Sequence, residues 1–385
     1  MRRTVFNEDH EAFRETIRDF IAAEVVPVYD QWLEAGQAPR DFYRKLGELG
    51  VFGIEVPEEF GGAGETSFKF QAVITEECAR AGVSFGGSGV HTGLCLPYLL
   101  AYCNDEQKKR WLPDFVSGDL MTAIAMTEPG TGSDLAGMKT TAKLSEDGTH
   151  YVLNGAKTFI TGGVHADRVI VCARTAPATP EDRRAGISLL VVDTKSEGYA
   201  VGRKLEKLGL RTSDTAELSF TDVKVPVEDL LGEEGKGFSY LGQNLPQERL
   251  AIAMGAYAQA SAAIAFAKAY VQDRTVFGQS VAAFQNTKFV LADCKAEVDA
   301  AQAVVDRALD AHDAGELTGA DAASAKLFCT EVAARVIDKC LQLHGGYGYM
   351  LEYPIARLYA DNRVNRIYGG TSEVMRSIIA KSMGL

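Results

Sequence analysis

The spacing of apolar residues changes twice along the chain and predicts three segments. In residues 1–118 apolar side chains recur every three or four positions, which indicates helices. Asn7 can cap the first helix, and Pro27 is expected to interrupt it. A second helix is predicted over Asp41–Leu49, and the glycine-rich stretch Gly82–Gly93 breaks the pattern before the next one. This segment is therefore expected to be a helical domain.

Residues 119–230 carry shorter apolar runs that predict strands. The runs are rich in β-branched residues and are separated by turn signals such as Glu146-Asp147-Gly148 and Gly162-Gly163. They are Tyr151–Thr161, Arg168–Arg174, Gly186–Asp193 and Ala216–Val225. No helix-length periodic segment lies between them, so the crossovers of a parallel sheet are not expected. The segment is predicted to be a small antiparallel β domain.

Residues 231–385 return to long helical periods. Apolar residues at spacings of three and four predict helices over Glu248–Asp273, Gln285–Ala314 and Asp321–Leu343, and a shorter one over Ser372–Met383. Long helices joined by short loops imply a bundle. The fold class is therefore predicted to be α+β and mostly helical, with domains over 1–118, 119–230 and 231–385.

Length, charge and cysteine spacing exclude several classes of protein. A chain of 385 residues is long enough for two or three domains. The net charge of −12 argues against nucleic-acid binding, which needs a basic surface. Seven dispersed cysteines without a C-x-x-C pair indicate neither a metal site nor a disulfide framework. No signal core and no apolar run of ~20 residues are visible, so a cytoplasmic protein without a membrane span is expected.

Two polar, glycine-containing strings lie in the predicted β domain. Thr127–Asp134 offers hydroxyls and backbone N–H groups that can form an anion-binding nest, although such a loop is more often an ordinary connection. Asn154–Thr161 by itself indicates a hairpin strand with a buried Phe159. Neither string identifies a function without motifs from elsewhere in the chain.

Three further strings lie in the predicted bundle. Arg274–Gly278 precedes Phe284-Gln285, and Gln342–Tyr349 ends the third long helix. Ile367–Glu373 places two glycines before a helix for which Thr371 is a good N-cap. Glycine backbone and the free N–H groups of a first helical turn can approach a ligand closely.

Together these strings resemble those of the acyl-CoA dehydrogenase family, and the resemblance covers most of the chain. It implies an N-terminal helical domain, a middle β domain and a C-terminal four-helix bundle, with FAD as cofactor and no metal. The implied cofactor contacts are Ile124, Met126, Thr127, Gly132, Ser133, Phe159, Thr161, Arg274, Phe277, Gln285, Gln342, Gly345, Gly346, Thr371 and Glu373. In the family Arg274 reaches the flavin of a neighbouring subunit, so a homotetramer built as a dimer of dimers is implied. Val276 stands where the family often has a threonine, a polar cofactor contact.

The catalytic base is where this chain departs from many relatives. Many members of the family carry a catalytic glutamate at the position of Gly369. Subclasses similar to the long-chain and isovaleryl dehydrogenases have glycine there and Glu-Arg at the position of Glu248-Arg249. The local string Leu245–Leu250 most resembles the long-chain type. The resemblance thus implies Glu248 as the base, and substrate contacts from Ser133, Arg249, Tyr368, Gly369 and Gly370.

The implied reaction is α,β-dehydrogenation of a fatty acyl-CoA to a trans-2-enoyl-CoA. Glu248 would remove the α-proton, and the β-hydrogen would leave as hydride to the flavin. Electron-transfer flavoprotein is the implied electron acceptor. A short branched-chain substrate of the isovaleryl type remains an alternative. A non-catalytic flavoprotein scaffold is a second alternative, and the compensating carboxylate of Glu248 argues against it.

Overall fold

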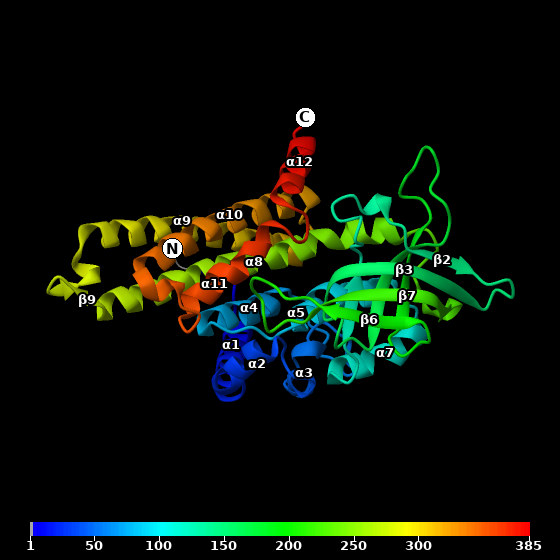
Figure 1. The fold of residues 1–385 in the computed structure, drawn as a ribbon, viewed down its shortest axis with the longest axis horizontal. Coiled ribbons are helices and arrows are strands. Elements are labelled where there is room, and N and C mark those ends of the chain that lie inside the picture. Colours follow the sequence, from blue (N-terminus) through cyan, green and yellow to red (C-terminus); the bar gives the residue numbers. More distant parts are fainter. Residues whose placement is uncertain (1–2) are drawn as a thin grey trace.

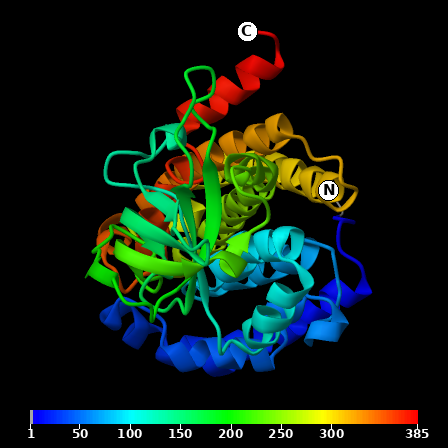
Figure 2. The same cartoon turned by 90° about the vertical axis from the view of Figure 1, so that its right-hand side faces the viewer.

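The sheet lies at one end of an elongated molecule whose long axis follows three long helices. Figures 1 and 2 show the shorter N-terminal helices packed along one side of these long helices and next to the sheet. This arrangement comes from a computed structural model, which describes residues 3–385. The mostly helical α+β fold predicted from the sequence is confirmed.

Seven helices build the N-terminal part. They are α1 (Glu8–Phe20), α2 (Tyr29–Ala35), α3 (Arg40–Glu48), α4 (Lys69–Ala81), α5 (Ser88–Val90), α6 (Leu96–Tyr102) and α7 (Asp105–Ser117). Asn7 caps α1 as predicted, since its side chain accepts from the His10 N–H at 3.0 Å. Pro27 deforms the helical path rather than breaking it: a π turn at Ile21–Val25 and a 3-10 turn at Val26–Val28 lead into α2.

Eight strands form the central sheet. They are β1 (Thr122–Ala125), β2 (Thr141–Leu144), β3 (His150–Thr161), β4 (Arg168–Arg174), β5 (Ile187–Asp193), β6 (Tyr199–Lys204), β7 (Thr215–Pro226) and β8 (Leu230–Leu231). Seven of them follow the order β6-β7-β3-β2-β4-β5-β8, and β1 pairs with β4 outside this order. The prediction of an antiparallel sheet was wrong at two pairings, because β1 and β2 both run parallel to β4. β1 is four residues long and buried throughout, so its sequence lacks the alternation that reveals an exposed strand.

The C-terminal part contains the long helices. Its elements are α8 (Gly237–Asp273), the hairpin β9 (Thr275–Val276) and β10 (Gln279–Ser280), α9 (Gln285–Asp313), α10 (Gly319–Leu343), α11 (Pro354–Asn362) and α12 (Ser372–Ser382). α8 begins 11 residues before the predicted start at Glu248, because Pro246 is tolerated inside the helix. A proline removes one backbone hydrogen bond, and the packing of a 37-residue helix offsets that loss.

α8 is the central helix of this part. Its alanine-rich face packs with α9, α10 and α4 in one hydrophobic core. Among the described residues it is also the one helix that is long and apolar enough, by length and composition, to cross a membrane, and 56% of its most apolar window is buried in the fold.

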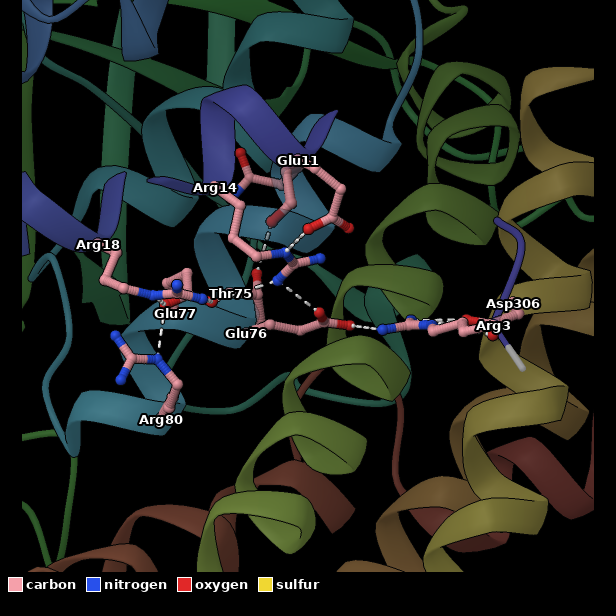
Figure 3. Close-up of polar contacts among 10 residues, drawn as sticks. Arg3, Glu11, Arg14, Arg18, Thr75, Glu76, Glu77, Arg80 and Asp306 are labelled. Atoms are coloured by element: carbon pink, nitrogen blue, oxygen red, sulfur yellow. Dashed lines mark hydrogen bonds and ion pairs between the residues drawn. The ribbon is translucent and has the colours of Figure 1, made fainter. Parts of the chain in front are cut away.

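An ion-pair network joins the N-terminal part to the long helices. Arg3 lies between Glu76 of α4 and Asp306 of α9, with N–O distances of 2.6 Å to each (Figure 3). Arg14 of α1 contacts Glu76 as well and reaches the buried carboxylate of Glu77. The network thus connects α1, α4 and α9, three elements that are far apart in the sequence.

Candidate active site

Glu248 is a buried carboxylate near the start of α8. Its side chain is 4% exposed, and its Oε1 accepts a hydrogen bond of 3.2 Å from the hydroxyl of Tyr98 on α6. Burial raises the pKa of Glu248 to about 7, and the hydrogen bond from Tyr98 and the charge of Arg249 oppose that rise. No described residue donates to Oε2 of Glu248, so one carboxylate oxygen is available to a ligand.

The glycine segment Gly369-Gly370 lies beside α8, one helical turn from Glu248. A Cβ added to Gly369 would lie 2.4 Å from Cδ1 of Ile252, and both glycines have left-handed backbones, with φ of +61° and +97°. Arg249 donates from Nε to the carbonyl of Gly369 at 3.4 Å. The structure therefore brings together three of the predicted active-site positions: Glu248, Arg249 and the glycine segment.

Tyr368 and Thr371 flank the glycines. The hydroxyl of Tyr368 donates to Asn365 at 2.7 Å, while its ring is partly exposed. Thr371 caps α12 as predicted, accepting from the N–H of Val374. Glu373, in the first turn of α12, is exposed and forms an ion pair with Arg376 at 3.4 Å.

Phe159 of β3 is an exposed aromatic residue on the β domain. The expectation from the local string was a buried phenylalanine, but its side chain is 68% exposed and its φ is +61°. A left-handed backbone is a strained state for a bulky residue, and such strain gathers at ligand sites. An exposed aromatic ring held in this way can stack on a planar ligand such as a flavin ring.

A buried ion pair anchors the loop Thr127–Asp134 to the β domain. Lys157 of β3 contacts Glu128 at 3.0 Å and donates to the Met126 carbonyl at 3.0 Å. Glu128 also accepts from the N–H groups of Lys139 and Thr140. Because Glu128 is turned inwards, it leaves the loop surface free of its charge.

The remaining predicted residues of the β-domain set differ in exposure. Gly132 and Ser133 are exposed, while Met126, Thr127 and Thr161 are partly buried. Ile124 differs, because its side chain is 7% exposed and packs in the hydrophobic core. Only the backbone of Ile124 could therefore face a cofactor.

A second predicted set lines a pocket of about 600 Å³ at the far end of α8. Arg274, Gln342, Gly345 and Gly346 all border this pocket, and Val276 contributes to its wall. Within residues 3–385 no carboxylate forms an ion pair with the exposed Arg274. Its guanidinium lies 5.8 Å from the ring centre of Tyr347. A free, exposed guanidinium beside a pocket suits a phosphate-bearing ligand.

Phe277 and Gln285 are close in the sequence to residues that line this pocket. Phe277 stands at the tip of the β9–β10 hairpin, 96% exposed with φ of +49°. Gln285 begins α9 and is exposed. Neither side chain borders the pocket.

The two sets lie at opposite ends of the molecule. Gly237, the first residue of α8, packs against β5, whereas Arg274 directly follows the last residue of α8. A helix of 37 residues spans roughly 55 Å at about 1.5 Å per residue. Figure 1 shows the sheet and the β9 hairpin at the two ends of the long axis. One cofactor can therefore contact both sets only where two copies of the chain meet.

Two side chains of this site were missed by the sequence reasoning. Tyr98 carries no signal, because it lies 150 positions before Glu248 in an apolar string. Lys326 is 1% exposed and donates to the Gly370 carbonyl at 2.6 Å. The sequence does contain a signal for Lys326. This lysine interrupts an otherwise apolar stripe of α10 that includes Ala322, Cys329 and Ala333.

Family models match nearly the whole chain. The N-terminal domain model of acyl-CoA dehydrogenases matches residues 7–119, the middle domain model residues 123–223, and the C-terminal domain model residues 235–384. These matches place the chain in a class of flavin-dependent oxidoreductases. The chain belongs to the acyl-CoA dehydrogenase family, whose members are FAD-dependent, and the family, enzyme class and cofactor predicted from the sequence are confirmed.

Individual relatives are similar over the same span. The chain is 43% identical to the mitochondrial long-chain specific acyl-CoA dehydrogenase of Sus scrofa, covering 99% of this chain and 88% of that protein. An acyl-CoA dehydrogenase structure from Geobacillus kaustophilus is 46% identical, with a TM-score of 0.95 and 99% of both chains covered. An acyl-CoA dehydrogenase from Bacillus anthracis, solved in complex with FAD, is 33% identical with a TM-score of 0.90, covering 98% of this chain and 67% of that one.

Proposed function

We propose that this member of the family dehydrogenates long-chain fatty acyl-CoA thioesters to trans-2-enoyl-CoA products, with Glu248 as the base. The observation that supports this most is the pairing of a buried carboxylate at Glu248 with a glycine at 369 beside it. A scaffold without activity would not require a buried carboxylate, whose desolvation costs stability. The base lies on α8, one turn before Ile252.

The residues of this chain divide the chemical work. Oε1 of Glu248 is held by Tyr98, so Oε2 is free to take the α-proton of the thioester. A pKa of about 7 makes Glu248 a stronger base than an exposed glutamate while leaving much of it ionised near neutral pH. The chemistry that a bound FAD would supply is the acceptance of the β-hydrogen as hydride.

The thioester oxygen gains negative charge as the proton leaves. Within residues 3–385 the N–H groups of Gly369, Gly370 and Thr371 donate to no backbone or side-chain acceptor, so they can donate to a ligand. Backbone donors fixed in place at such an oxygen lower the barrier, because they need no reorganisation during the reaction.

The separation of the two binding sets supports a cofactor site shared between subunits. We propose that FAD is held by the β-domain set of one subunit and the Arg274 set of another, in a homotetramer. α12 projects beyond the body of the subunit in Figures 1 and 2, and Leu385 at its end is 85% exposed. Electron-transfer flavoprotein is proposed as the acceptor of the electrons. The cytoplasmic location and the domain limits at residues 118 and 230 stay predictions.

The length of the acyl chain is the finest part of the proposal. The long-chain specific enzyme of Sus scrofa, at 43% identity, supports a long acyl chain. The alternative is a short branched chain of the isovaleryl type, which also accompanies the Glu-Arg arrangement at positions 248 and 249. The anaerobic bleaching of the flavin by a series of C4 to C18 acyl-CoAs and by isovaleryl-CoA separates the two.

Glu248→Gln tests the base. Glutamine is nearly isosteric and cannot accept the proton, so flavin reduction by acyl-CoA should fall by ~10²–10⁴-fold or more. FAD content and product binding should match the wild type. Asp293→Asn, an exposed carboxylate on α9, is the control and should reduce its flavin at the normal rate. A normal rate in Glu248→Gln would place the base elsewhere.

A further inference from the structure

Lys326 is a buried cation without a carboxylate partner. It is 1% exposed, and no acidic side chain among residues 3–385 forms an ion pair with it. Burial lowers the pKa of Lys326 to about 8, and the nearby charge of Arg249 adds to this. An unpaired buried charge costs stability, since it loses its hydration without a compensating ion. A lysine in this position therefore calls for an explanation beyond packing.

The contacts of Lys326 point to the glycine segment. Its ammonium donates to the carbonyl of Gly370 at 2.6 Å, and Arg249 donates to the preceding carbonyl, that of Gly369, at 3.4 Å. Two buried cations from α10 and α8 thus hold two consecutive carbonyls. Both glycines have positive φ, a conformation that a fixed pair of contacts can maintain.

The cations also determine where the neighbouring N–H groups point. In a trans peptide the C=O of one residue and the N–H of the next are antiparallel. Holding the Gly369 and Gly370 carbonyls therefore directs the N–H groups of Gly370 and Thr371 away from Arg249 and Lys326. A cation on a carbonyl polarises the same peptide group and makes its N–H a better donor.

We propose that Lys326 is a positioning residue of the reaction: with Arg249 it fixes and polarises the Gly369–Thr371 backbone whose free N–H groups meet the thioester oxygen. This inference rests on the proposed function. It explains why a costly charge is kept in the core beside a segment that has no side chains of its own. Lys326 touches neither substrate nor reacting atoms and acts through the peptide groups.

Lys326→Met in the FAD-loaded protein tests the proposal. Methionine has a similar length and packs well among the apolar side chains of α10, so the melting temperature should be unchanged or higher. The rate of flavin reduction by a saturating acyl-CoA should fall on the order of 10–100-fold. The dissociation constant of the acyl-CoA should change by less than about threefold, because the positioned donors act mainly on the charge that develops during proton removal.

Two further variants complete the experiment. Lys326→Gln keeps a neutral donor and should give an intermediate rate, whereas Lys295→Met, at an exposed lysine of α9, should behave as wild type. A wild-type rate in Lys326→Met would overturn the inference. The inference would also be overturned if both Lys326 variants lost FAD and had lower melting temperatures, because that result would give Lys326 a structural role. Failure of the proposed function would instead appear as absent flavin reduction in the wild type and in Lys295→Met.

Discussion

The hydroxyl of Tyr98 donates a hydrogen bond of 3.2 Å to Oε1 of Glu248, and both side chains are buried. The bond joins α6 of the N-terminal part to α8, so the placement of the base depends on how two parts of the fold pack. It also favours the ionised form of Glu248, against the burial that favours the neutral form. The relationship predicts a measurable effect on the pH dependence of the reaction.

Tyr98→Phe should shift the pH profile of flavin reduction towards higher pH. The wild-type rate is expected to rise with pH through about 7, as Glu248 loses its proton and becomes able to act as a base. Removing a hydrogen bond to a charged group costs about 1.5–3 kcal/mol, which corresponds to a rise of about 1–2 pH units in the apparent pKa. Stopped-flow flavin reduction between pH 5.5 and 9.5 measures the shift.

Tyr102→Phe is the matched control for this prediction. Tyr102 lies on the same helix, and its hydroxyl donates to Gln243 rather than to Glu248. Its profile should coincide with that of the wild type. If Tyr98→Phe also coincides with the wild type, the titration of the profile belongs to a group other than Glu248.

Moving the base to position 369 should require space at Ile252. An added Cβ at Gly369 would lie 2.4 Å from Cδ1 of Ile252 and 3.9 Å from Cγ1. Valine at 252 removes that Cδ1 methyl and should cost at most about 0.5–1.5 kcal/mol of stability. Glu248→Gln/Gly369→Glu should therefore regain little activity, and the triple variant with Ile252→Val should regain more.

The readout is flavin bleaching across the C4 to C18 series. The new carboxylate fills pocket volume, so the triple variant should prefer shorter chains than the wild type does. Ile252→Val alone should keep near-normal activity. Equal recovery with and without Ile252→Val would show that the loop at 369 moves freely, contrary to the clamp formed by Arg249 and Lys326.

The sequence predicted the long helices α8, α9 and α10 and the strands β3, β4, β5 and β7, and two of the failures have clear physical causes. Pro246 hid the first turns of α8 because proline is a weak helix residue and only tertiary packing makes it acceptable there. β1 was invisible because it is short and buried on both faces. In the site, Glu248 and the two glycines were identified by local sequence motifs that resemble those of the family. The roles assigned to these residues stay predictions. Tyr98 was not found, since only the fold brings it to the base.

The buried carboxylate of Glu77 should stabilise the fold at neutral pH and lose this effect at acidic pH. It accepts from Arg80 at 2.6 Å and from Arg18 at 3.1 Å. Burial by itself would raise the pKa of Glu77, but these contacts outweigh it and lower the pKa below its usual value. A lowered pKa in the folded state means stability that is present above the unfolded pKa of about 4.3 and is lost as the pH falls through the folded value.

Glu77→Gln should lower the free energy of unfolding by about 1–3 kcal/mol at pH 7, because three arginines lose a charged acceptor. The difference from wild type should shrink on acidification, as wild-type Glu77 becomes protonated. Denaturant unfolding at pH 7 and pH 3.5 checks both statements. Glu106→Gln, at an exposed helical ion pair with Lys109, is the control and should change stability by well under 1 kcal/mol. A constant difference at both pH values would contradict the role of the charge.

Arg274→Ala should weaken FAD retention without unfolding the protein. The guanidinium is exposed, has no ion pair within residues 3–385 and borders the pocket at the end of α8, so its loss removes an interaction with a ligand rather than with the fold. Flavin absorbance after dialysis should drop well below that of the wild type, while the melting temperature of the apoprotein stays the same. Arg307→Ala, at an exposed arginine of α9, should keep its flavin.

Mixed oligomers make the Arg274 prediction specific to a site shared between subunits. If the flavin is held by the β domain of one subunit and Arg274 of another, co-assembled Arg274→Ala and Phe159→Ala chains should contain some sites with both residues intact. FAD retention in the mixture should then exceed that of either pure variant, and gel filtration should show a dimer or tetramer. A flavin-retaining monomer, or a mixture no better than its parents, would confine the cofactor to one chain.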